Sequence, residues 1–391
     1  MRLLHIVRSL DPATGGPAEA VRTLVRYAPP QLPSEIVTVD EPTSAFLSNY
    51  ECRVHAIGRG EPISAYPRAL GPWLRAHRRH YDAAVVHGLW NFTAHETRRA
   101  LRSCLPYAVF PHGMLDPYFA RAFPAKHFLK KWPFWLASEY WTLRAARRVL
   151  FTTQEEADLA RQSFWLHRWQ PQVISLGTEP LAEATEADRE DFLAMCGAAR
   201  GRRFLLFLGR IHPKKAVDLL LEAFTQRATQ QMDLDLVIAG PVAEEQSAWV
   251  TSLRQKAAVA GIAARVHWPG MVEGAAKRGA FDLCEAFVLP SHQENFGIAV
   301  AEAMAAARPV LLSESINIAA EIAADGAGFV EQDTLAGTLR LLDRWNALSA
   351  PERAAMGQRA LATFSARYDI RRNAAALASV FDEATAPHSA S

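Results

Sequence analysis

The chain has 391 residues, too many for one ordinary hydrophobic core and enough for two domains. Hydrophobic residues make up 50% and charged residues 21%, proportions typical of globular proteins, which exclude a largely disordered chain. Residues 1–178 hold 22 Lys and Arg against 14 Asp and Glu, whereas the rest holds 21 against 27. The first half is therefore expected to face something anionic. No basic run of the kind that binds nucleic acid occurs.

The composition also predicts the compartment in which the protein acts. Its four cysteines are scattered without metal-ligand spacing or a pairing pattern, which indicates reduced thiols. The apolar start, Met1–Leu10, is short and predicts a first strand rather than a signal peptide. No apolar run is long enough to span a bilayer. We therefore expect a cytoplasmic protein.

Short apolar runs recur along the chain without the alternation of a half-exposed strand, as buried parallel strands require. The first set comprises Leu3–Val7, Ile36–Val39, Ala83–His87, Tyr107–Pro111 and Val149–Thr152, and the second comprises Phe204–Leu208, Leu234–Ala239, Val266–Trp268, Ala286–Leu289 and Pro309–Leu312. Amphipathic segments lie between these runs, and one of them places Val217, Leu220, Leu221 and Phe224 on a single helical stripe. Alternating strands and helices predict the α/β class, with two doubly wound parallel sheets.

A change in composition separates the two sets of strands. Between residues 177 and 202 the sequence passes from an apolar run into a polar stretch rich in Ala and Glu. We therefore predict an N-terminal domain over residues 1–178 and a C-terminal domain over residues 179–366. In the remaining segment, residues 367–391, Tyr368–Phe381 is predicted to be a helix and Ala384–Ser391 a frayed tail.

The strongest motif follows the predicted strand that ends at Leu289. It reads Pro-Ser-His-Gln-Glu-Asn-Phe-Gly, ends at Gly297 and leads into a helix. In α/β sheets, ligands bind beyond the carboxyl ends of strands, where helix N-termini present free N–H groups. Glu294 in the turn and Glu302 two turns into the helix are placed to contact a sugar and a ribose in one extended ligand. Alternatively, Glu294 caps the helix and Glu302 is solvated.

A second motif, Gly209–Lys215, also follows a predicted strand and opens a helix. Arg210 and Lys215 flank a tight turn, so both can reach a diphosphate whose negative charge grows as a glycosidic bond breaks. Fixed cations next to developing charge stabilise a transition state strongly in a preorganised site. The alternative is an ordinary basic turn in solvent.

Three further segments follow predicted strands in the first half. Gly15 and Gly16 form a pair that lets the backbone approach a phosphate closely, although most such pairs are simply turns. His87 and His112 each lie at the end of a strand and precede a glycine. A single histidine in this position is more often structural, but two of them favour a binding site at this edge of the sheet.

The sequence contains no recognisable metal site. No set of His, Cys, Asp and Glu has convincing ligand spacing, and no Gly-Lys-Ser/Thr phosphate loop occurs. The segment Asp233-Leu-Asp235 has the pattern of a metal-binding pair in another transferase architecture. Here it opens a predicted strand, so capping and solvation explain it better. We predict that the protein uses no metal and no cofactor.

Together these segments resemble glycosyltransferase family 4 (group 1), a large family of retaining GT-B glycosyltransferases. The match runs in order along nearly the whole chain and includes the family's Glu-x7-Glu motif at Glu294 and Glu302. The resemblance implies two facing Rossmann-like domains with a cleft between them, the first binding the acceptor and the second the nucleotide sugar. It also implies that the C-terminal helix crosses back to the N-terminal domain.

The activity that the resemblance implies is the transfer of a hexose from a nucleotide-sugar donor to a glycan or lipid-linked oligosaccharide, in exopolysaccharide or surface polysaccharide synthesis. The implied catalytic residues are Arg210, Lys215, Glu294 and His112. The implied donor-binding residues are Gly15, Gly16, Asn295, Phe296, Gly297, Ile298 and Glu302. His87 and Asp116 are candidates for the acceptor side.

Three positions depart from the family's pattern. Ala216 stands where many relatives have glycine, and the turn at residues 305–309 also lacks their usual glycine. The segment Ser315–Glu321 replaces a commoner Gly-Gly form, which puts the donor-sugar contacts of that loop in doubt. The phosphate chemistry is unaffected.

Basic and aromatic residues interleave in residues 121–148, a segment predicted to be helical. The cations are Lys126, Lys130, Lys131, Arg144, Arg147 and Arg148, and the aromatic residues are Trp132, Phe134, Trp135 and Trp141. Such a surface suits docking on anionic lipid, so the enzyme is predicted to act on a lipid-linked acceptor at the inner face of the cytoplasmic membrane. Alternatively, the tryptophans belong to the core and the cations to a solvated face.

Two other functions stay open. A sugar-nucleotide epimerase shares the double-Rossmann shape, but it lacks this Glu-x7-Glu arrangement. A non-catalytic scaffold that binds a sugar nucleotide is disfavoured, because Arg210, Lys215 and both glutamates are intact.

Overall fold

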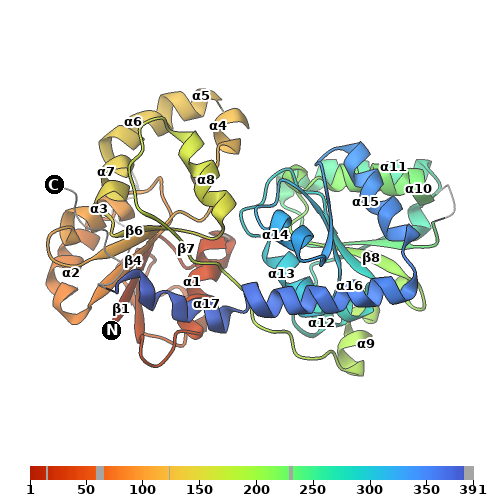
Figure 1. Ribbon diagram of the computed structural model, residues 1–391, viewed down its shortest axis with the longest axis horizontal. Helices are drawn as coiled ribbons and strands as arrows, with labels where there is room; N and C mark the ends of the chain where they lie inside the picture. The colour runs from red at the N-terminus through yellow and green to blue at the C-terminus, as the bar shows by residue number, and fades with distance from the viewer. Residues whose placement is uncertain (15, 59–65, 123, 229–231, 383–391) are drawn as a thin grey trace. The chain divides into compact units, whose positions relative to one another are not determined.

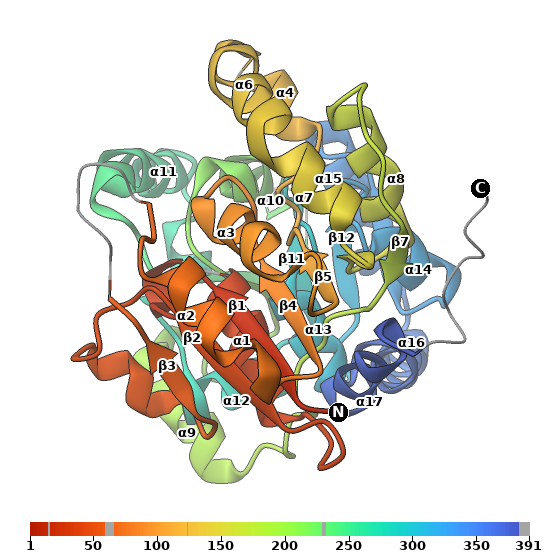
Figure 2. The same cartoon turned by 90° about the vertical axis from the view of Figure 1, so that its left-hand side faces the viewer.

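The computed structural model describes residues 1–14, 16–58, 66–122, 124–228 and 232–382. Contacts divide the chain into two compact units, one of Met1–Leu176 with the segment from Ile370 onward, and one of Gly177–Asp369. This division lies beside the predicted limits at residues 178 and 366. Each unit has a central parallel sheet with helices packed against it, as Figures 1 and 2 show. The predicted α/β class with two parallel sheets is therefore confirmed.

The sheet of the first unit has seven parallel strands in the described residues, in the order β3-β2-β1-β4-β5-β6-β7. They are β1 (Leu3–Val7), β2 (Ser34–Thr38), β3 (Val54–Ala56), β4 (Ala83–His87), β5 (Tyr107–Phe110), β6 (Arg148–Phe151) and β7 (Pro171–Val173). The five central strands match the prediction. The prediction missed the edge strands β3 and β7, because each is three residues long and carries partly exposed side chains, so neither forms an apolar run.

The two faces of this sheet carry different side chains, because successive residues of a strand point to opposite faces. Leu4 and Ile6 of β1, Val86 of β4 and Val109 of β5 belong to one large apolar cluster. The parallel register pairs His5 with Val85, and His87 with Val7 and Phe110, so the histidines belong to the other face.

Helices cover both faces of this sheet. They are α1 (Gly16–Arg26), α2 (Leu70–His77), α3 (Phe92–Leu101), α4 (Tyr118–Ala122), α5 (Pro124–Lys126), α6 (Trp132–Phe134), α7 (Tyr140–Ala145), α8 (Gln154–Ser163) and α17 (Ile370–Ala376). Two π-helical segments, His127–Lys131 and Trp135–Glu139, connect α5 to α6 and α6 to α7. Short 3-10 turns lie at Pro12–Thr14, Ala45–Asn49, Arg78–His80 and Ala378–Val380.

The sheet of the second unit has six parallel strands within the described ranges, in the order β10-β9-β8-β11-β12-β13. They are β8 (Phe204–Leu208), β9 (Asp235–Ala239), β10 (Val266–Gly270), β11 (Ala286–Leu289), β12 (Val310–Ser313) and β13 (Gly328–Glu331). The first five match the predicted set. The prediction missed β13, whose four residues include Gly328 and Glu331 and therefore do not form an apolar run.

The helices of the second unit are α9 (Glu186–Met195), α10 (Val217–Ala228), α11 (Ser247–Val259), α12 (Gly274–Leu283), α13 (Ile298–Ala305), α14 (Ala319–Ala324), α15 (Leu335–Ala347) and α16 (Ala350–Thr363). Its 3-10 turns are Gly197–Ala199, Pro213–Lys215, Glu244–Gln246 and Ala263–Arg265, and a π-helical segment follows α16 at Phe364–Tyr368. In the part of the chain that the structure describes, every helix is too short or too polar to cross a bilayer.

The predicted helix over Tyr368–Phe381 is wrong in one respect, because the chain leaves the helix at Asp369. The carbonyl oxygen of Tyr368 accepts a hydrogen bond from the amide of Thr178 at 3.0 Å, and Asp369 pairs with Thr178 as an isolated bridge. A new helix, α17, then packs against α1 in the first unit (Figures 1 and 2). There, Asn373 Nδ2 donates to the carbonyl oxygen of Leu176 at 3.0 Å. The predicted frayed tail lies outside the described residues.

Candidate functional site

The two strongest motifs meet at the carboxyl ends of β8 and β11, two central strands of the second sheet. β8 and β11 are neighbours, although the chain runs from β8 to β9 on one side before it returns to β11 on the other. The loops that follow β8 and β11 therefore lie at the topological switch point, where ligands of open α/β sheets bind. The amide of His292 in the second loop donates to the carbonyl oxygen of Lys214 in the first at 2.9 Å.

An ion pair joins the same two loops. Lys215 Nζ lies 2.5 Å from Glu294 Oε1, with the side chains 20% and 14% exposed. The turn that presents Lys215 is held by His212, whose ring accepts from the amide of Lys214 at 3.1 Å. Glu294 is aligned by its backbone, because its amide donates to the carbonyl oxygen of Ser315 at 3.1 Å. The structure thus brings together two residues that are far apart in the sequence and were both predicted to be catalytic.

Arg210 is the exposed member of this site, one residue beyond Gly209 at the end of β8. The amide of Gly209 donates to the carbonyl oxygen of Ala239 at 3.0 Å. A methyl group on Gly240 would overlap the carbonyl oxygen of Gly209, so only glycine at position 240 allows the loops after β8 and β9 to approach this closely. Arg210 follows this close contact and is exposed.

The segment after Glu294 leads into helix α13. Gly297 has a φ of 75° and caps the helix without a side-chain hydrogen bond. The ring of Phe296 packs edge-on against Tyr368 at 5.5 Å and is buried, so it anchors the turn. The carbonyl oxygen of Glu294 accepts from the amide of Asn317 at 3.1 Å, and Asn317 Nδ2 donates to Asn295 Oδ1 at 3.3 Å. The Ser315–Glu321 loop, whose sequence departs from the family's pattern, therefore supports the turn after Glu294 through Asn317.

Glu302, in the second turn of α13, forms its own ion pair. Its Oε1 lies 2.6 Å from Nζ of Lys277, which belongs to α12. The sequence contains no signal for Lys277, because one lysine on an amphipathic helix is ordinary and its partner lies on another element. The second unit thus presents two Lys–Glu pairs, and the carboxylates of both are largely buried.

Three histidines form a row in the first unit. His5 Nδ1 lies 2.9 Å from His87 Nε2, and His87 Nδ1 lies 2.9 Å from His112 Nε2. Both ring nitrogens of His87 are therefore occupied, so it cannot contact an acceptor through a nitrogen without breaking the row. The sequence indicated His87 and His112, but His5 gave no signal because it sits inside an apolar strand.

Burial keeps these rings neutral. It lowers the pKa of His5 to about 4 and the pKa of His112 to about 3, and it lowers the pKa of His87 as well. His112 has a φ of 53°, which is rare outside glycine. Its turn is held by Glu156, a buried carboxylate that accepts from the amide of Gly113 at 2.7 Å. The ring of His112 also stacks on Phe110, with ring centres 4.5 Å apart.

A pocket of about 850 Å³ lies at the carboxyl ends of β1, β2 and β4, and it is lined by polar residues such as Arg8, Asn91 and His87. Asp40, also in the lining, accepts from Ser9 Oγ at 2.7 Å and from the amide of Leu10 at 2.7 Å, which holds the loop after β1. The size suits a small polar ligand.

Three more residues of the first unit, Asp116, Gly15 and Gly16, were predicted to belong to the site. Asp116 is not among the described residues that line this pocket; its Oδ1 accepts from the amide of Tyr118 at 2.8 Å and orders the turn. Gly16 begins α1, and a Cβ there would meet no atom within 4 Å. Gly15 lies outside the described residues. The roles predicted for these residues stay predictions.

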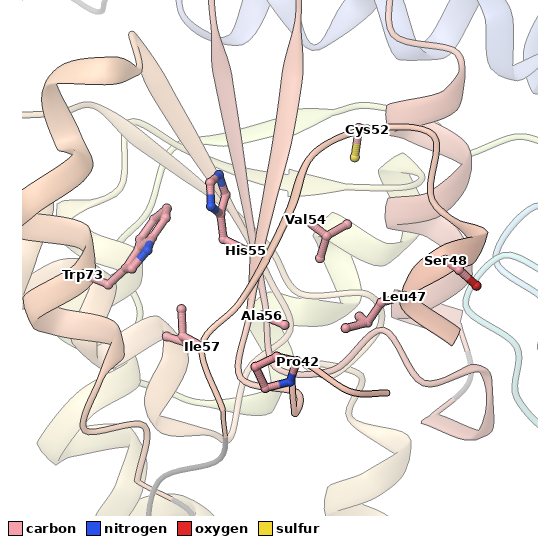
Figure 3. Close-up of a pocket in the computed structure, with 9 residues that line it drawn as sticks. All are labelled: Pro42, Leu47, Ser48, Cys52, Val54, His55, Ala56, Ile57 and Trp73. Carbon is pink, nitrogen blue, oxygen red and sulfur yellow. The ribbon is translucent and has the colours of Figure 1, made fainter. Parts of the chain in front are cut away.

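A second hollow, of about 520 Å³, lies beside the edge strand β3 (Figure 3). Its lining combines apolar side chains with Ser48, Cys52 and His55, and the rings of His55 and Trp73 are tilted against each other with their centres 4.9 Å apart. His55 Nε2 lies 2.8 Å from a carboxylate oxygen of Glu35, and burial raises the pKa of the Cys52 thiol to about 11. The hollow thus offers no reactive thiolate and no convergent charges.

The basic and aromatic segment is only partly on the surface. Trp135 is buried, as the alternative interpretation expected, and stacks on Phe164 in the core with ring centres 4.1 Å apart. Arg148 is also buried, contrary to both interpretations. The exposed apolar side chains are instead Phe128 at 67%, Leu129 at 77%, Leu136 at 48% and Trp141 at 45%. Lys126, Lys130 and Arg144 are exposed in the same segment.

No group of three or more His, Cys, Asp or Glu side chains in the described parts of the chain is arranged to hold a metal ion. Asp235 of the Asp-Leu-Asp segment is buried and paired with Arg202 at 2.9 Å and with His267 at 2.9 Å. The expected solvation is therefore wrong for Asp235, whereas Asp233 is exposed. All four cysteines are free.

The chain matches two protein families. Residues 188–361 match the family of group 1 glycosyl transferases, and residues 15–177 match the glycosyl transferase 4-like domain. The D-inositol 3-phosphate glycosyltransferase of Streptomyces avermitilis is 31% identical over 193 residues, which are 48% of this chain and 41% of that relative. The phosphatidyl-myo-inositol mannosyltransferase of Mycobacterium leprae is 30% identical over 161 residues, 40% of this chain and 39% of that relative. The matched region thus spans about two-fifths of these curated relatives.

Solved structures extend the comparison to the whole chain. HepE of Anabaena, solved in complex with UDP, is 18% identical and superimposes with a TM-score of 0.78 over 97% of this chain and 99% of its own. At this identity the likeness shows the fold alone. Together with the family matches, it confirms the resemblance found in the sequence: the chain belongs to the group 1 glycosyltransferases, glycosyltransferase family 4, and has the GT-B fold.

Proposed function

We propose that the protein is a retaining glycosyltransferase that moves a hexose from a nucleotide-sugar donor to a glycan or lipid-linked oligosaccharide, in exopolysaccharide or surface polysaccharide synthesis. The observation that carries the proposal is the Lys215–Glu294 pair, which joins two loops at the switch point of the second sheet. Arg210 lies in the first of these loops and Glu302 in the helix after the second. Cations and carboxylates that lie together at the carboxyl ends of β8 and β11 suit a ligand with both phosphates and hydroxyls.

The cations of this site bind the donor's diphosphate. A lysine ammonium has three N–H donors, of which Glu294 uses one, so Lys215 keeps donors for phosphate oxygens. Because the charges of Lys215 and Glu294 cancel, the charge of Arg210 leaves the site positive for an anionic leaving group. Glu294 and the amides that follow it bind hydroxyls of the donor sugar. Glu302 binds the ribose, with Lys277 holding its carboxylate in place.

The reaction exchanges one bond at the anomeric carbon of the sugar. The bond from this carbon to the phosphate oxygen breaks, and a bond to the acceptor's hydroxyl oxygen forms on the same face. The hydroxyl proton passes to the departing phosphate oxygen, so the configuration is retained without a protein nucleophile. Arg210 and Lys215 stabilise the charge that grows on the diphosphate. The proposal requires neither a metal nor a cofactor.

The relatives suggest which donors to test first. HepE was solved with UDP-glucose, and the two curated relatives are named as a D-inositol 3-phosphate glycosyltransferase and a phosphatidyl-myo-inositol mannosyltransferase. The pocket of about 850 Å³ in the first unit is the proposed acceptor site, because polar groups from three strand ends and their loops converge there. The exposed apolar and basic residues of residues 121–148 are proposed to dock the enzyme on the cytoplasmic face of an anionic membrane.

The first test is a thermal-shift panel of UDP-, GDP-, ADP- and dTDP-sugars. A ligand at about 100 times its Kd stabilises the fold by about 2.7 kcal/mol, which is easily measured. Lys215→Ala and Glu294→Gln are expected to abolish the shift. Their matched controls, Lys256→Ala and Glu273→Gln, change exposed residues of α11 and of the cap of α12, and should preserve it.

Turnover with the donor found in this way separates the three functions. A transferase consumes donor only when acceptor is present, an epimerase consumes it alone, and a scaffold does not consume it. Arg210→Ala and Lys215→Ala should each slow transfer about 100-fold or more, and chelation of metal should leave the rate unchanged. NMR of the product must show the donor's anomeric configuration. Near-native rates in both variants with an intact fold, or an inverted product, would refute the proposed roles.

A further inference from the structure

The row of histidines connects the centre of the first sheet to the turn after β5. β1, β4 and β5 lie side by side, as Figure 2 shows, and the row crosses all three. His5 and His87 are buried, with 0% and 1% of their surfaces exposed, and His112 is partly exposed at the end of the row. Successive rings also overlap, with centres 5.2 Å apart in both pairs.

Hydrogen bonding gives such a row a direction. A neutral imidazole carries one N–H group and one bare nitrogen, so each contact needs a donor on one ring and an acceptor on the next. Either every ring donates toward His112, or every ring donates toward His5. Among the described residues no carboxylate bonds to any of the three rings, so the two ends of the row decide between these arrangements.

The buried end of the row favours one direction. His5 Nε2 is buried and has no hydrogen-bond partner in the described structure. If the rings donate toward His5, this atom carries a buried N–H group without an acceptor, and such groups are rare in native proteins. If they donate toward His112, the same atom is a bare nitrogen, which leaves an acceptor rather than a donor unpaired. The second arrangement puts the remaining hydrogen on Nδ1 of His112.

His112, at the outer end of the row, is placed to donate the hydrogen on its Nδ1 to a ligand. The ring of His112 is fixed by its stacking on Phe110 and by the contact of its Nε2 with His87. Its Nδ1 makes no hydrogen bond to any residue that the structure describes. We propose that His5 and His87 are positioning residues that hold His112 as the Nδ1–H tautomer, so that this group donates to a hydroxyl oxygen of the sugar substrate. The sugar as the ligand rests on the proposed function, whereas the tautomer does not.

The tautomers can be measured directly in the full-length protein. Long-range 1H–15N spectra of protein labelled at its 13 histidines distinguish Nδ1–H from Nε2–H rings. We expect His5, His87 and His112 all to be Nδ1–H tautomers at neutral pH, whereas histidines in solution favour Nε2–H. A wild-type spectrum in which His112 carries its hydrogen on Nε2 overturns the proposal, and no variant needs to fold for this result.

A variant tests whether His5 sets the state of His112. His5→Phe keeps a ring in the core but removes the donor to His87, so His112 should become a mixture of tautomers. His80→Phe, at an exposed position, is the matched control and should leave His112 unchanged. An unchanged tautomer of His112 in folded His5→Phe would overturn the proposal.

Binding measurements test the use of the hydrogen. His5→Phe should weaken binding of the nucleotide sugar about tenfold, the size of one hydrogen bond, and leave binding of the free nucleoside diphosphate unchanged. Equal weakening of both ligands would indicate a merely structural role and would count against the proposal. If no nucleotide sugar binds wild-type protein, the proposed function fails, while the tautomer spectra still decide the inference about the row.

Discussion

Two ionisable side chains inside the first unit, His5 and Glu139, are held in their neutral forms at neutral pH. Burial lowers the pKa of His5 to about 4 and raises the pKa of Glu139 to about 8. Glu139 Oε1 accepts from the amide of Trp90 at 2.7 Å, and Trp90 has a φ of 63°. These buried groups hold the loops after β4 and β5 in backbone conformations that are rare outside glycine, and those loops lie at the candidate acceptor pocket.

The buried His5 makes stability depend on pH. In the unfolded chain a histidine takes up a proton below about pH 6.5, whereas folded His5 does so only below about pH 4. Between these values the unfolded state binds more protons, so the free energy of unfolding falls as the pH falls. From pH 7 to pH 5 we expect His5 alone to account for a loss of about 2 kcal/mol.

Urea denaturation at both pH values checks this expectation. Between pH 7 and pH 5, the free energy of unfolding of His5→Phe should fall by about 2 kcal/mol less than that of the wild type. The exposed His80→Phe should behave as wild type. The same loss in all three proteins would mean that His5 is not buried in the neutral form.

At the scale of elements, two alanines occupy positions where glycine is the usual residue. Ala216 has a φ of 54° and connects the Lys215 turn to α10, and Ala307 has a φ of 56° after α13. After α13 the amide of Arg308 donates to the carbonyl oxygen of Ala303 at 2.9 Å, as in a helix end capped by a left-handed residue. These are two of the places where the sequence departs from the family's glycines, so the backbone keeps the glycine conformation without the residue.

Replacing Ala307 by glycine should stabilise the protein. Ala307→Gly is expected to raise the free energy of unfolding by about 1 kcal/mol, because glycine adopts a positive φ without a Cβ clash. Ala216→Gly should gain less, because Ala216 is fully buried and the variant loses a packed methyl group. The control Ala355→Gly, in the exposed middle of α16, should lower it by about 1 kcal/mol. Urea denaturation measures all three. Destabilisation by Ala307→Gly equal to that by Ala355→Gly would contradict the left-handed conformation at residue 307.

At the scale of the whole molecule, the first unit carries an apolar surface next to basic residues. Leu129, Leu136 and Trp141 are exposed along the helical segment from α5 to α7, with Lys130 and Arg144 beside them in sequence. Residues 1–178 also carry more Lys and Arg than Asp and Glu. This combination is typical of helices that lie in the interface of an anionic membrane.

Vesicle sedimentation tests the membrane surface. Wild-type protein should sediment with phosphatidylglycerol vesicles at low salt, and it should do so less at high salt and with neutral phosphatidylcholine. The double variant Leu129→Ser/Trp141→Ser should bind about tenfold more weakly, because it removes apolar side chains that would be buried in the membrane. Val259→Ser, at a position that is 84% exposed in the second unit, is the control and should bind as wild type. No binding of wild type to phosphatidylglycerol at low salt would rule the surface out.

Much of the architecture follows from the sequence alone. The apolar runs predict ten of the strands described here, because a strand buried on both faces needs apolar residues at every position. The loops after β8 and β11 are also predictable, because motif residues such as Arg210 and Glu294 directly follow such runs. The family and the GT-B fold follow from the order of these motifs.

Only the tertiary structure decides which residues become partners. Lys277 pairs with Glu302 and His5 with His87 through contacts between separate elements, and no local pattern encodes such contacts. Trp135 is buried on one side of its helical segment together with the polar Ser138 and Glu139, whereas Leu136 and Trp141 are exposed, and nothing in the local pattern shows which side faces the core. The sequence by itself therefore determined the elements, their order and the motif loops, since these depend on neighbouring residues. The ion pairs, the histidine row and the exposed surface depend on distant residues, so they were decided by the fold.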